Sequence, residues 1–139
     1  MNQAKYNQYI TAFNSACLGS ISFADFYDEY YEPDAIFEYI PAARKNKGRE
    51  EIIAFWQGVH GIMTEEIQPH ISLLITDSAL AVEAPIDFKC KKDLEWVGVT
   101  HKAGSSFRLR MAAFYDLSEN DKFKYVRVYS IYHEAYQVK

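Results

Sequence analysis

The sequence predicts an α+β fold in which three helices cover the concave face of a cone-shaped, curved antiparallel sheet. In the first half of the chain, apolar residues recur every three or four positions, a pattern typical of amphipathic helices. In the second half they recur at every second position, which is typical of half-buried strands. Helices that precede a run of strands favour an α+β architecture, and long strands bend. The helices would therefore close a conical pocket.

Three helical patterns occupy the first half of the chain. The first has an apolar stripe made of Tyr6, Ile10, Phe13 and Cys17. The second begins after Ser22, which can cap it together with Asp25, and it ends before Pro33. The third begins at Gly48, where the following acidic residues suit the positive end of a helix. Its buried stripe comprises Ile52, Phe55, Trp56, Val59 and Met63, with His60 on the same face.

A short strand between the second and third helices reads PDAIFEYIP, residues 33–41. Ala35, Phe37 and Tyr39 alternate along it and would form its inward row. That row ends in a phenol. A strand packed between helices often lines a pocket, so Tyr39 is expected to face the pocket.

The second half of the chain predicts four longer strands. They cover residues 70–76, 79–90, 106–117 and 122–133. Pro85 marks a bulge or an edge in the second of them. In the third strand, Phe107 and Met111 share the inward face, while Arg108 and Arg110 point outward.

Composition places the chain among globular proteins and predicts a single domain over residues 1–139. The net charge of −4 makes nucleic acid an unexpected partner. Cys17 and Cys90 lack metal or redox spacing and suit a reducing compartment, with a disulfide as the open alternative. No apolar leader and no apolar run of about 18 residues is present, which predicts a cytoplasmic protein without a membrane partner.

Two stretches, YYEPDAIFEYI and KGREEIIAFW, carry a resemblance to a known superfamily. Their strongest local features are Tyr-x-x-Asp-Ala at Tyr31–Ala35 and Gly-Arg-Glu-x-Ile at Gly48–Ile52. With the order of elements, they resemble the nuclear transport factor two-like superfamily, in its SnoaL-like and ketosteroid-isomerase-like branch. The resemblance implies a cystatin-like roll and a homodimer formed through the outer face of the sheet.

The resemblance to the ketosteroid isomerases implies a general base at Tyr39, an oxyanion-hole aspartate near Met111, and a tyrosine near Phe13 or Asn14. All three residues are replaced here. A phenol with a pKa of about 10 is protonated at neutral pH and cannot be the resting base. Steroid-type isomerisation is therefore not expected.

Two further comparisons concern single residues. Scytalone dehydratase is similar in layout and implies that Tyr39 holds a water or a carbonyl, and that His70 takes part. The segment VTHKAG, Val99–Gly104, is similar to a Gly-Thr-His segment of SnoaL-like polyketide cyclases and points to His101. The carboxylate those cyclases use near the end of the sheet is missing where this chain reads YSIYHE.

The candidate catalytic residues are therefore Tyr39, His70 and His101. Tyr39 would hold an oxygen, and a histidine with a pKa near about 6.5 would move a proton. Each also has a structural interpretation: a core tyrosine, a strand-edge histidine, and a solvated loop histidine. Alignment places Asp87 on the outward face, and it stays a reserve base for the case in which a bulge at Pro85 turns it inward. His60 and His133 are interpreted as structural.

The candidate substrate-binding residues are Phe13, Tyr31, Phe37, Phe55, Trp56, Ile86, Phe88, Met111, Val128 and Tyr132. The four histidines lack ligand spacing, so no metal and no cofactor is expected. We expect binding of a small, mostly apolar ring compound, with cofactor-free cyclase, dehydratase (lyase) or isomerase chemistry. The alternatives are a non-catalytic ligand-binding or dimerisation module, and a subunit that stabilises a larger enzyme. The dimer would use Arg108, Arg110 and Arg127 on the outer face.

Overall fold

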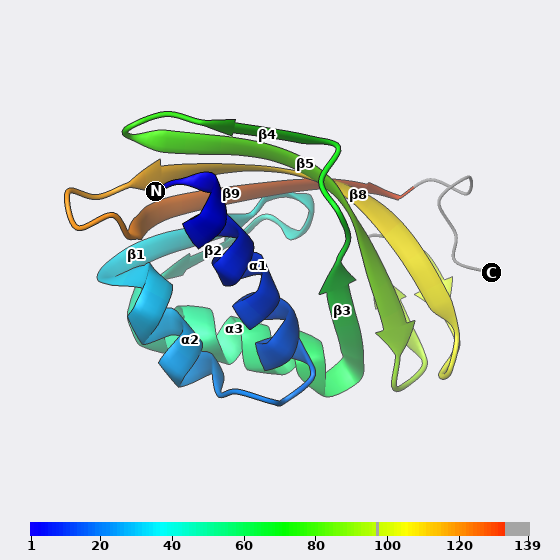
Figure 1. Ribbon diagram of the computed structural model, residues 1–139. Helices are drawn as coiled ribbons and strands as arrows, with labels where there is room; N and C mark the ends of the chain where they lie inside the picture. The colour runs from blue at the N-terminus through cyan, green and yellow to red at the C-terminus, as the bar shows by residue number, and fades with distance from the viewer. Residues whose placement is uncertain (97, 133–139) are drawn as a thin grey trace.

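The computed structural model describes residues 1–96 and 98–132, except for the side chain of Tyr132. Within these residues, three helices lie on the concave side of a strongly curled sheet (Figure 1). The helices are α1 (Gln3–Cys17), α2 (Phe23–Tyr30) and α3 (Gly48–Ile62), and a short 3-10 turn, η1, covers Ile40–Ala42. The strands are β1 (Tyr31–Tyr39), β2 (Arg44–Lys47), β3 (Met63–Ile67), β4 (Ser72–Ile75), β5 (Ala79–Cys90), β6 (Leu94–Trp96), β7 (Val99–His101), β8 (Ser106–Leu117) and β9 (Phe123–Tyr132). The α+β prediction is confirmed.

Helices α1 and α2 begin where a side chain accepts a hydrogen bond from a free backbone N–H group. Asn2 accepts a bond from the Lys5 N–H at the start of α1, and Ser22 accepts one from Asp25 at the start of α2, as the sequence predicts. At α3, Gly48 has a φ of 81°, a left-handed conformation that favours glycine.

The main sheet has seven strands in the order β2-β1-β9-β8-β5-β3, with β4 pairing with the other half of β5. Every pair is antiparallel except β1 with β9, which is parallel. The parallel pair sets Tyr39 beside Val128. Pro85 has no N–H to donate and lies where the partner of β5 changes from β3 to β4.

Four of the strands are absent from the sequence prediction: β2, β3, β6 and β7. The last two form a separate hairpin that packs against the interior through Trp96 and His101. Met63, assigned above to the third helix, opens β3 instead. His133, interpreted above as a structural residue, lies outside the described residues.

One end of the interior is filled by aromatic side chains from α1, α2, β1, β8 and β9. Phe123 is fully buried there, and its ring centroid lies 4.7 Å from that of Tyr9 and 4.8 Å from that of Tyr115. The Tyr9 and Tyr31 hydroxyls lie 3.0 Å apart and share a hydrogen bond. We call this set, Tyr6, Tyr9, Phe26, Tyr31, Tyr115 and Phe123, the closed end; Tyr9 and Tyr115 also reach the cavity described below.

The outer face of the sheet carries ion pairs across neighbouring strands. Arg108 holds Asp87 through two nitrogens, and Arg127 lies 3.2 Å from Asp116. Beside them, Tyr129 and Ile131 on β9 are exposed. Among the described residues, none of the helices combines the length and the apolar composition that a membrane crossing needs.

Candidate active site

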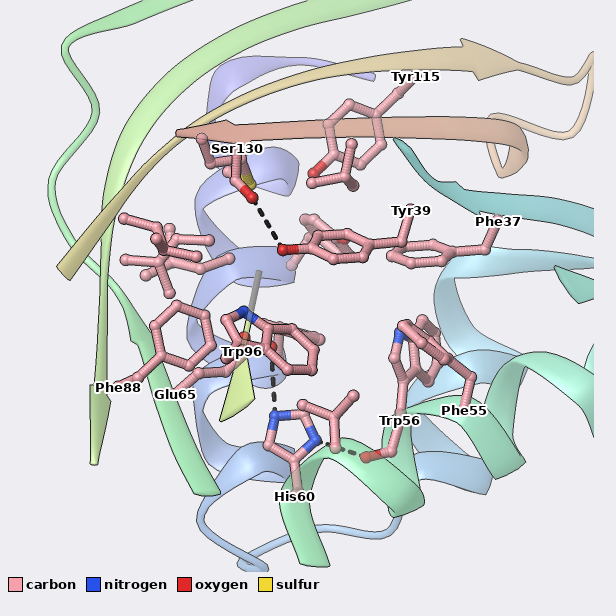
Figure 2. A pocket seen from close by; sticks show the side chains of 18 residues that line it. Phe37, Tyr39, Phe55, Trp56, His60, Glu65, Phe88, Trp96, Tyr115 and Ser130 are labelled. Carbon is pink, nitrogen blue, oxygen red and sulfur yellow. Dashed lines mark hydrogen bonds and ion pairs between the residues drawn. The ribbon is translucent and has the colours of Figure 1, made fainter. Parts of the chain in front are cut away.

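A cavity of about 60 Å³ lies at the other end of the interior, between α3, β1 and the curled part of the sheet (Figure 2). Its lining residues from the helices are Tyr9, Phe13, Phe55, Trp56, Val59 and His60. Those from β1 and β9 are Phe37, Tyr39, Val128 and Ser130. The remaining ones are Glu65, Ile67, Ile86, Phe88, Trp96, Leu109, Met111 and Tyr115. The wall is therefore mostly apolar, with a few polar groups that would orient a ligand.

Tyr39 supplies a hydroxyl on one side of this cavity. The parallel pairing of β1 with β9 brings it to Ser130, and the two hydroxyl oxygens lie 2.8 Å apart. Burial raises the pKa of Tyr39, and the bond with Ser130 offsets part of that rise. The phenol is therefore protonated at neutral pH and has a proton that it can donate in a hydrogen bond.

Trp96, from the β6–β7 hairpin, covers the space between Tyr39 and Phe88. Its ring lies 5.7 Å from that of Tyr39 at an interplanar angle of 30°, and 6.4 Å from that of Phe88. A short strand that is separate from the main sheet thus supplies one wall of the cavity. A ligand larger than the present space has to displace a residue of the wall.

Glu65 places a carboxylate in the cavity, facing the floor formed by α3. It lies on β3, where Met63, Glu65 and Ile67 alternate toward the interior and Glu66 points to solvent. Its side chain is 13% exposed. A carboxylate in apolar surroundings loses hydration and is costly unless it is paired. A hydrogen-bond donor or a cation close to Glu65 would therefore stabilise its carboxylate.

His60, near the end of α3, is the closest titratable partner of Glu65. Its Nδ1 lies 2.7 Å from the carbonyl oxygen of Trp56, which can only accept, so Nδ1 carries a proton. Its Nε2 lies 3.2 Å from Oε1 of Glu65. That distance suits a hydrogen bond, yet within the described residues Nε2 makes none, so the angle is unsuitable.

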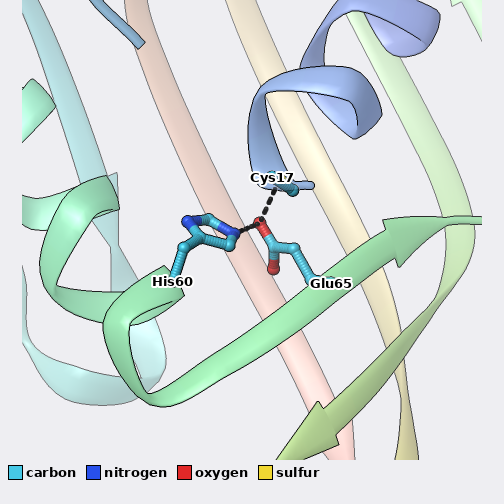
Figure 3. Close-up of side chains that lie close together, drawn as sticks. All are labelled: Cys17, His60 and Glu65. Carbon is cyan, nitrogen blue, oxygen red and sulfur yellow. Dashed lines mark hydrogen bonds and ion pairs between the residues drawn. The ribbon is translucent and has the colours of Figure 1, made fainter. Parts of the chain in front are cut away.

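Cys17, at the end of α1, also contacts the carboxylate of Glu65 (Figure 3). Its Sγ donates to Oε1 of Glu65 at 3.8 Å. Burial, together with the Glu65 charge, raises the pKa of this thiol well above its usual range. The two cysteines are free and buried. Glu65 is thus held by a weak thiol donor and an imperfectly aligned imidazole.

The indole N–H groups of Trp56 and Trp96 lack hydrogen-bond partners within the described residues, although both are buried. Both nitrogens face the interior space in Figure 2. The Trp96 N–H lies near the Tyr39 hydroxyl without the geometry of a hydrogen bond. Buried donors are almost always satisfied in folded proteins. Two buried indole donors without hydrogen-bond partners among the described residues therefore border the cavity.

Most of the sequence-predicted substrate-binding residues line this cavity together with Tyr39. They are Phe13, Phe37, Phe55, Trp56, Ile86, Phe88, Met111 and Val128. Tyr31 does not line it, because it is buried at the closed end. The side chain of Tyr132 lies outside the described residues. Whether any of these residues touches a substrate stays a prediction.

The two predicted catalytic histidines lie elsewhere. His70 is in the segment before β4, where its Nε2 bonds the Tyr6 hydroxyl at 2.6 Å. His101, on β7, stacks on Phe107, and their ring centroids lie 3.9 Å apart. Burial lowers the pKa of both. The reserve base Asp87 faces outward and pairs with Arg108. Proton transfer by these residues stays an untested prediction, and the geometry favours Glu65 with His60.

Sequence reasoning missed Glu65 as a pocket residue and interpreted His60 as structural. The signal for Glu65 was present: one polar residue alternates with Met63 and Ile67 in a five-residue run. Ser130 and Trp96 were missed as well. Ser130 shares the inward row of the last predicted strand, whereas nothing local marks Trp96.

No family model matches the sequence. A search of curated proteins found no match either. Solved structures do match. A candidate polyketide cyclase from Pseudomonas putida is 20% identical, with a TM-score of 0.70, over 96% of this chain and 95% of that one. One from Xanthomonas campestris is 15% identical, also with a TM-score of 0.70, over 93% and 92%.

A third match is a Catenulispora acidiphila protein with a ketosteroid isomerase-like fold, in complex with trimethylamine. It is 12% identical with a TM-score of 0.65, over 87% of this chain and 83% of that one. Other matches are described as NTF2-like proteins. This chain has the NTF2-like fold. The fold that the sequence resemblance implied is thereby confirmed, while the identities establish nothing about the reaction.

Proposed function

We propose that the cavity binds a small, mostly apolar ring compound through a carbonyl oxygen and moves a proton on it without a cofactor. The observation that carries this proposal is the Glu65 carboxylate inside an apolar cavity, 3.2 Å from His60. The donors Tyr39, Trp56 and Trp96 line the same cavity. A base and hydrogen-bond donors around one cavity are the parts that enolisation needs.

The step is a proton abstraction beside the carbonyl. Glu65 takes the proton from carbon, the C–H electron pair moves into the new C=C bond, and the carbonyl electrons move onto oxygen. Tyr39, held by Ser130 at 2.8 Å, donates to the developing oxyanion. Return of the proton to a different atom gives isomerisation. Loss of a β-hydroxyl as water, with the proton that Glu65 has taken, gives dehydration, and attack of the enolate on a second carbonyl gives cyclisation.

Size restricts the ligand. A cavity of about 60 Å³ holds a few water molecules, whereas benzene occupies an engineered cavity of about 150 Å³. A ring compound therefore enters only if a wall residue turns away. Trp96 is the best placed to do so, because it belongs to the separate β6–β7 hairpin.

The test uses cyclic ketones as probes, with cyclopentanone, cyclohexanone and 2-indanone in deuterated buffer. NMR follows loss of the protons next to the carbonyl. We expect the protein to accelerate exchange of at least one probe, and Glu65→Gln to lower that rate about 100-fold or more. Glu66→Gln is the matched control, because Glu66 is the neighbouring carboxylate on β3 and points to solvent. Exchange that survives in Glu65→Gln would refute the role of this carboxylate.

The alternative function, a dimerisation module, is favoured by the outer sheet face. Ile131 is 67% exposed there, beside Tyr129, whose ring contacts that of Phe114 at 6.1 Å. Aromatic and arginine side chains of this kind are enriched in interfaces. We expect a homodimer at micromolar concentration, which Ile131→Asp dissociates. Leu18→Asp is the control, because Leu18 is equally exposed at the end of α1. Sedimentation velocity measures both, and a monomeric wild-type chain would exclude this interface.

A further inference from the structure

We propose that Cys17, His60 and Glu65 bind a zinc ion at the edge of the cavity. The three residues come from α1, α3 and β3, and their ligand atoms all lie within 4.8 Å of one another (Figure 3). Thiolate, imidazole and carboxylate are the groups that zinc takes in proteins. The proposal departs from the sequence prediction of no metal, which considered only spacing along the chain.

Two of the three distances between these atoms are close to the edges of a zinc tetrahedron. Bond lengths of about 2.0 Å to nitrogen and oxygen and about 2.3 Å to sulfur give edges of about 3.3 Å for N–O and about 3.5 Å for S–O. The observed separations are 3.2 Å between Nε2 of His60 and Oε1 of Glu65, and 3.8 Å between that oxygen and Sγ of Cys17. The third separation, between Sγ of Cys17 and Nε2 of His60, is no more than 4.8 Å, and side-chain rotation has to bring it to an edge of about 3.5 Å.

The imidazole of His60 is oriented as a metal ligand. Its Nδ1–H donates to the Trp56 carbonyl oxygen at 2.7 Å. Such a bond from the far ring nitrogen accompanies most metal-bound histidines and leaves a lone pair on Nε2. Within the described residues, Nε2 makes no hydrogen bond, although it is buried and close to Glu65. Its lone pair is thus directed beside the carboxylate, where a shared ion would lie.

The carboxylate of Glu65 is poorly satisfied by its neighbours. A thiol is a weak donor, and Nε2 of His60 donates no hydrogen bond to the carboxylate. A zinc ion would neutralise the buried charge and satisfy all three groups at once, with release of the thiol proton to solvent. Three protein ligands leave a fourth position. Because His60 and Glu65 line the cavity, a water or a ligand oxygen can reach it.

Zinc binding does not rest on the proposed proton transfer, and the two describe different states of one site. A metal-bound Glu65 is no longer free to accept a proton. We therefore expect added zinc to suppress the exchange of ketone protons, and a chelator to restore it. Zinc affinity is measured without any ketone, so each proposal can fail while the other stands.

The first experiment titrates zinc into chelator-treated protein against a chromophoric competitor. We expect one ion per chain with a dissociation constant below about 1 μM, and a loss of about 100-fold or more in Cys17→Ser and in His60→Gln. Cys90→Ser is the matched control, because Cys90 is also buried and free but lies outside the cluster. Thermal unfolding verifies that each variant is folded.

The second experiment replaces zinc with cobalt(II) and records the absorption spectrum. We expect a thiolate-to-cobalt charge-transfer band and the visible bands of a four-coordinate ion. Both should vanish in Cys17→Ser and persist in Cys90→Ser. Folded wild-type protein that binds no zinc at micromolar concentration would overturn the proposal. Equal zinc affinity in wild type and Cys17→Ser, or a cobalt spectrum without the thiolate band, would overturn it too.

Discussion

The closed end and the cavity end of the interior use the same kinds of residue but treat polar atoms differently. At the closed end, Tyr9 bonds Tyr31 at 3.0 Å, and Tyr6 bonds His70 at 2.6 Å. At the cavity end, the Trp56 N–H and Nε2 of His60 have no hydrogen-bond partner within the described residues. The polar groups of the closed end bond one another, whereas these two groups of the cavity end remain free to bond a ligand.

We interpret this difference in hydrogen bonding as a division of roles between stability and function. Burial raises the pKa of Tyr9 and Tyr31 well above the usual range, so both phenols stay neutral and serve as fixed hydrogen-bonding groups. A buried donor without a hydrogen-bond partner lowers the stability of the folded state by about 1–3 kcal/mol. Proteins keep such donors mainly at functional sites, where a ligand supplies the partner. We therefore expect the closed end to hold the fold together and the cavity end to carry the chemistry.

Matched phenylalanine truncations should give the largest contrast. Phe123→Ala removes a fully buried ring from the closed end and should lower the free energy of unfolding by about 3–5 kcal/mol. Phe55→Ala removes a partly buried ring that already borders empty space, so the loss should be clearly smaller. Urea denaturation measures both. Equal losses would mean that the two ends contribute alike to stability.

A pair of hydroxyl deletions should sharpen the comparison. Tyr9→Phe leaves the buried Tyr31 hydroxyl without this partner and should cost about 1–3 kcal/mol of stability. Tyr39→Phe leaves only the half-buried Ser130, which water can reach, so the cost should stay below about 1 kcal/mol. Chemical denaturation gives the costs, and the ketone assay should show the reverse order. A greater loss of stability in Tyr39→Phe would contradict the division.

Much of the fold was predictable because its long elements have local signatures. The stripe from Tyr6 to Cys17 and the alternation from Phe107 to Tyr115 each repeat often enough to define a period. The parallel pairing of β1 with β9 joins segments about ninety residues apart and has no local signature. The sequence predicts the inward row of β1, but not that Tyr39 meets Ser130.

The candidate site was harder to predict, because its polar members converge from separate elements. Cys17, His60 and Glu65 stand on two helices and a strand, with no spacing that suggests a shared site. His60 was placed on the correct helical face but interpreted as structural. His70 suits a histidine base by sequence position, yet it precedes β4 and bonds Tyr6 at the closed end. The direction of the His70 side chain depends on the path of the segment that connects β3 to β4. The periodicity of the sequence does not determine that path.

Replacing the cavity carboxylate should stabilise the protein while it removes activity. Glu65→Gln keeps the shape of the side chain and relieves the burial of a charge held only by a thiol and a misaligned imidazole. We expect the free energy of unfolding at pH 7 in a chelating buffer to rise by about 0.5–1.5 kcal/mol. Glu66→Gln, at an exposed position, should stay within about 0.5 kcal/mol of wild type. A marked loss in Glu65→Gln would show that the pair with His60 holds the fold.

The smallest expected effect is a pH dependence that originates near the closed end. Burial lowers the pKa of His70, so the unfolded chain takes up its proton at a higher pH than the folded one. Stability from this residue is complete above the unfolded value of about 6.5 and falls as pH drops through the lower folded value. His70→Gln can still bond Tyr6 but cannot titrate, so its stability should fall less between pH 7 and 5. His101, whose pKa burial also lowers, adds a similar slope that remains in this variant. If His70→Gln and wild type lose stability in parallel on acidification, His70 is not part of the titration, and the closed end is insensitive to pH.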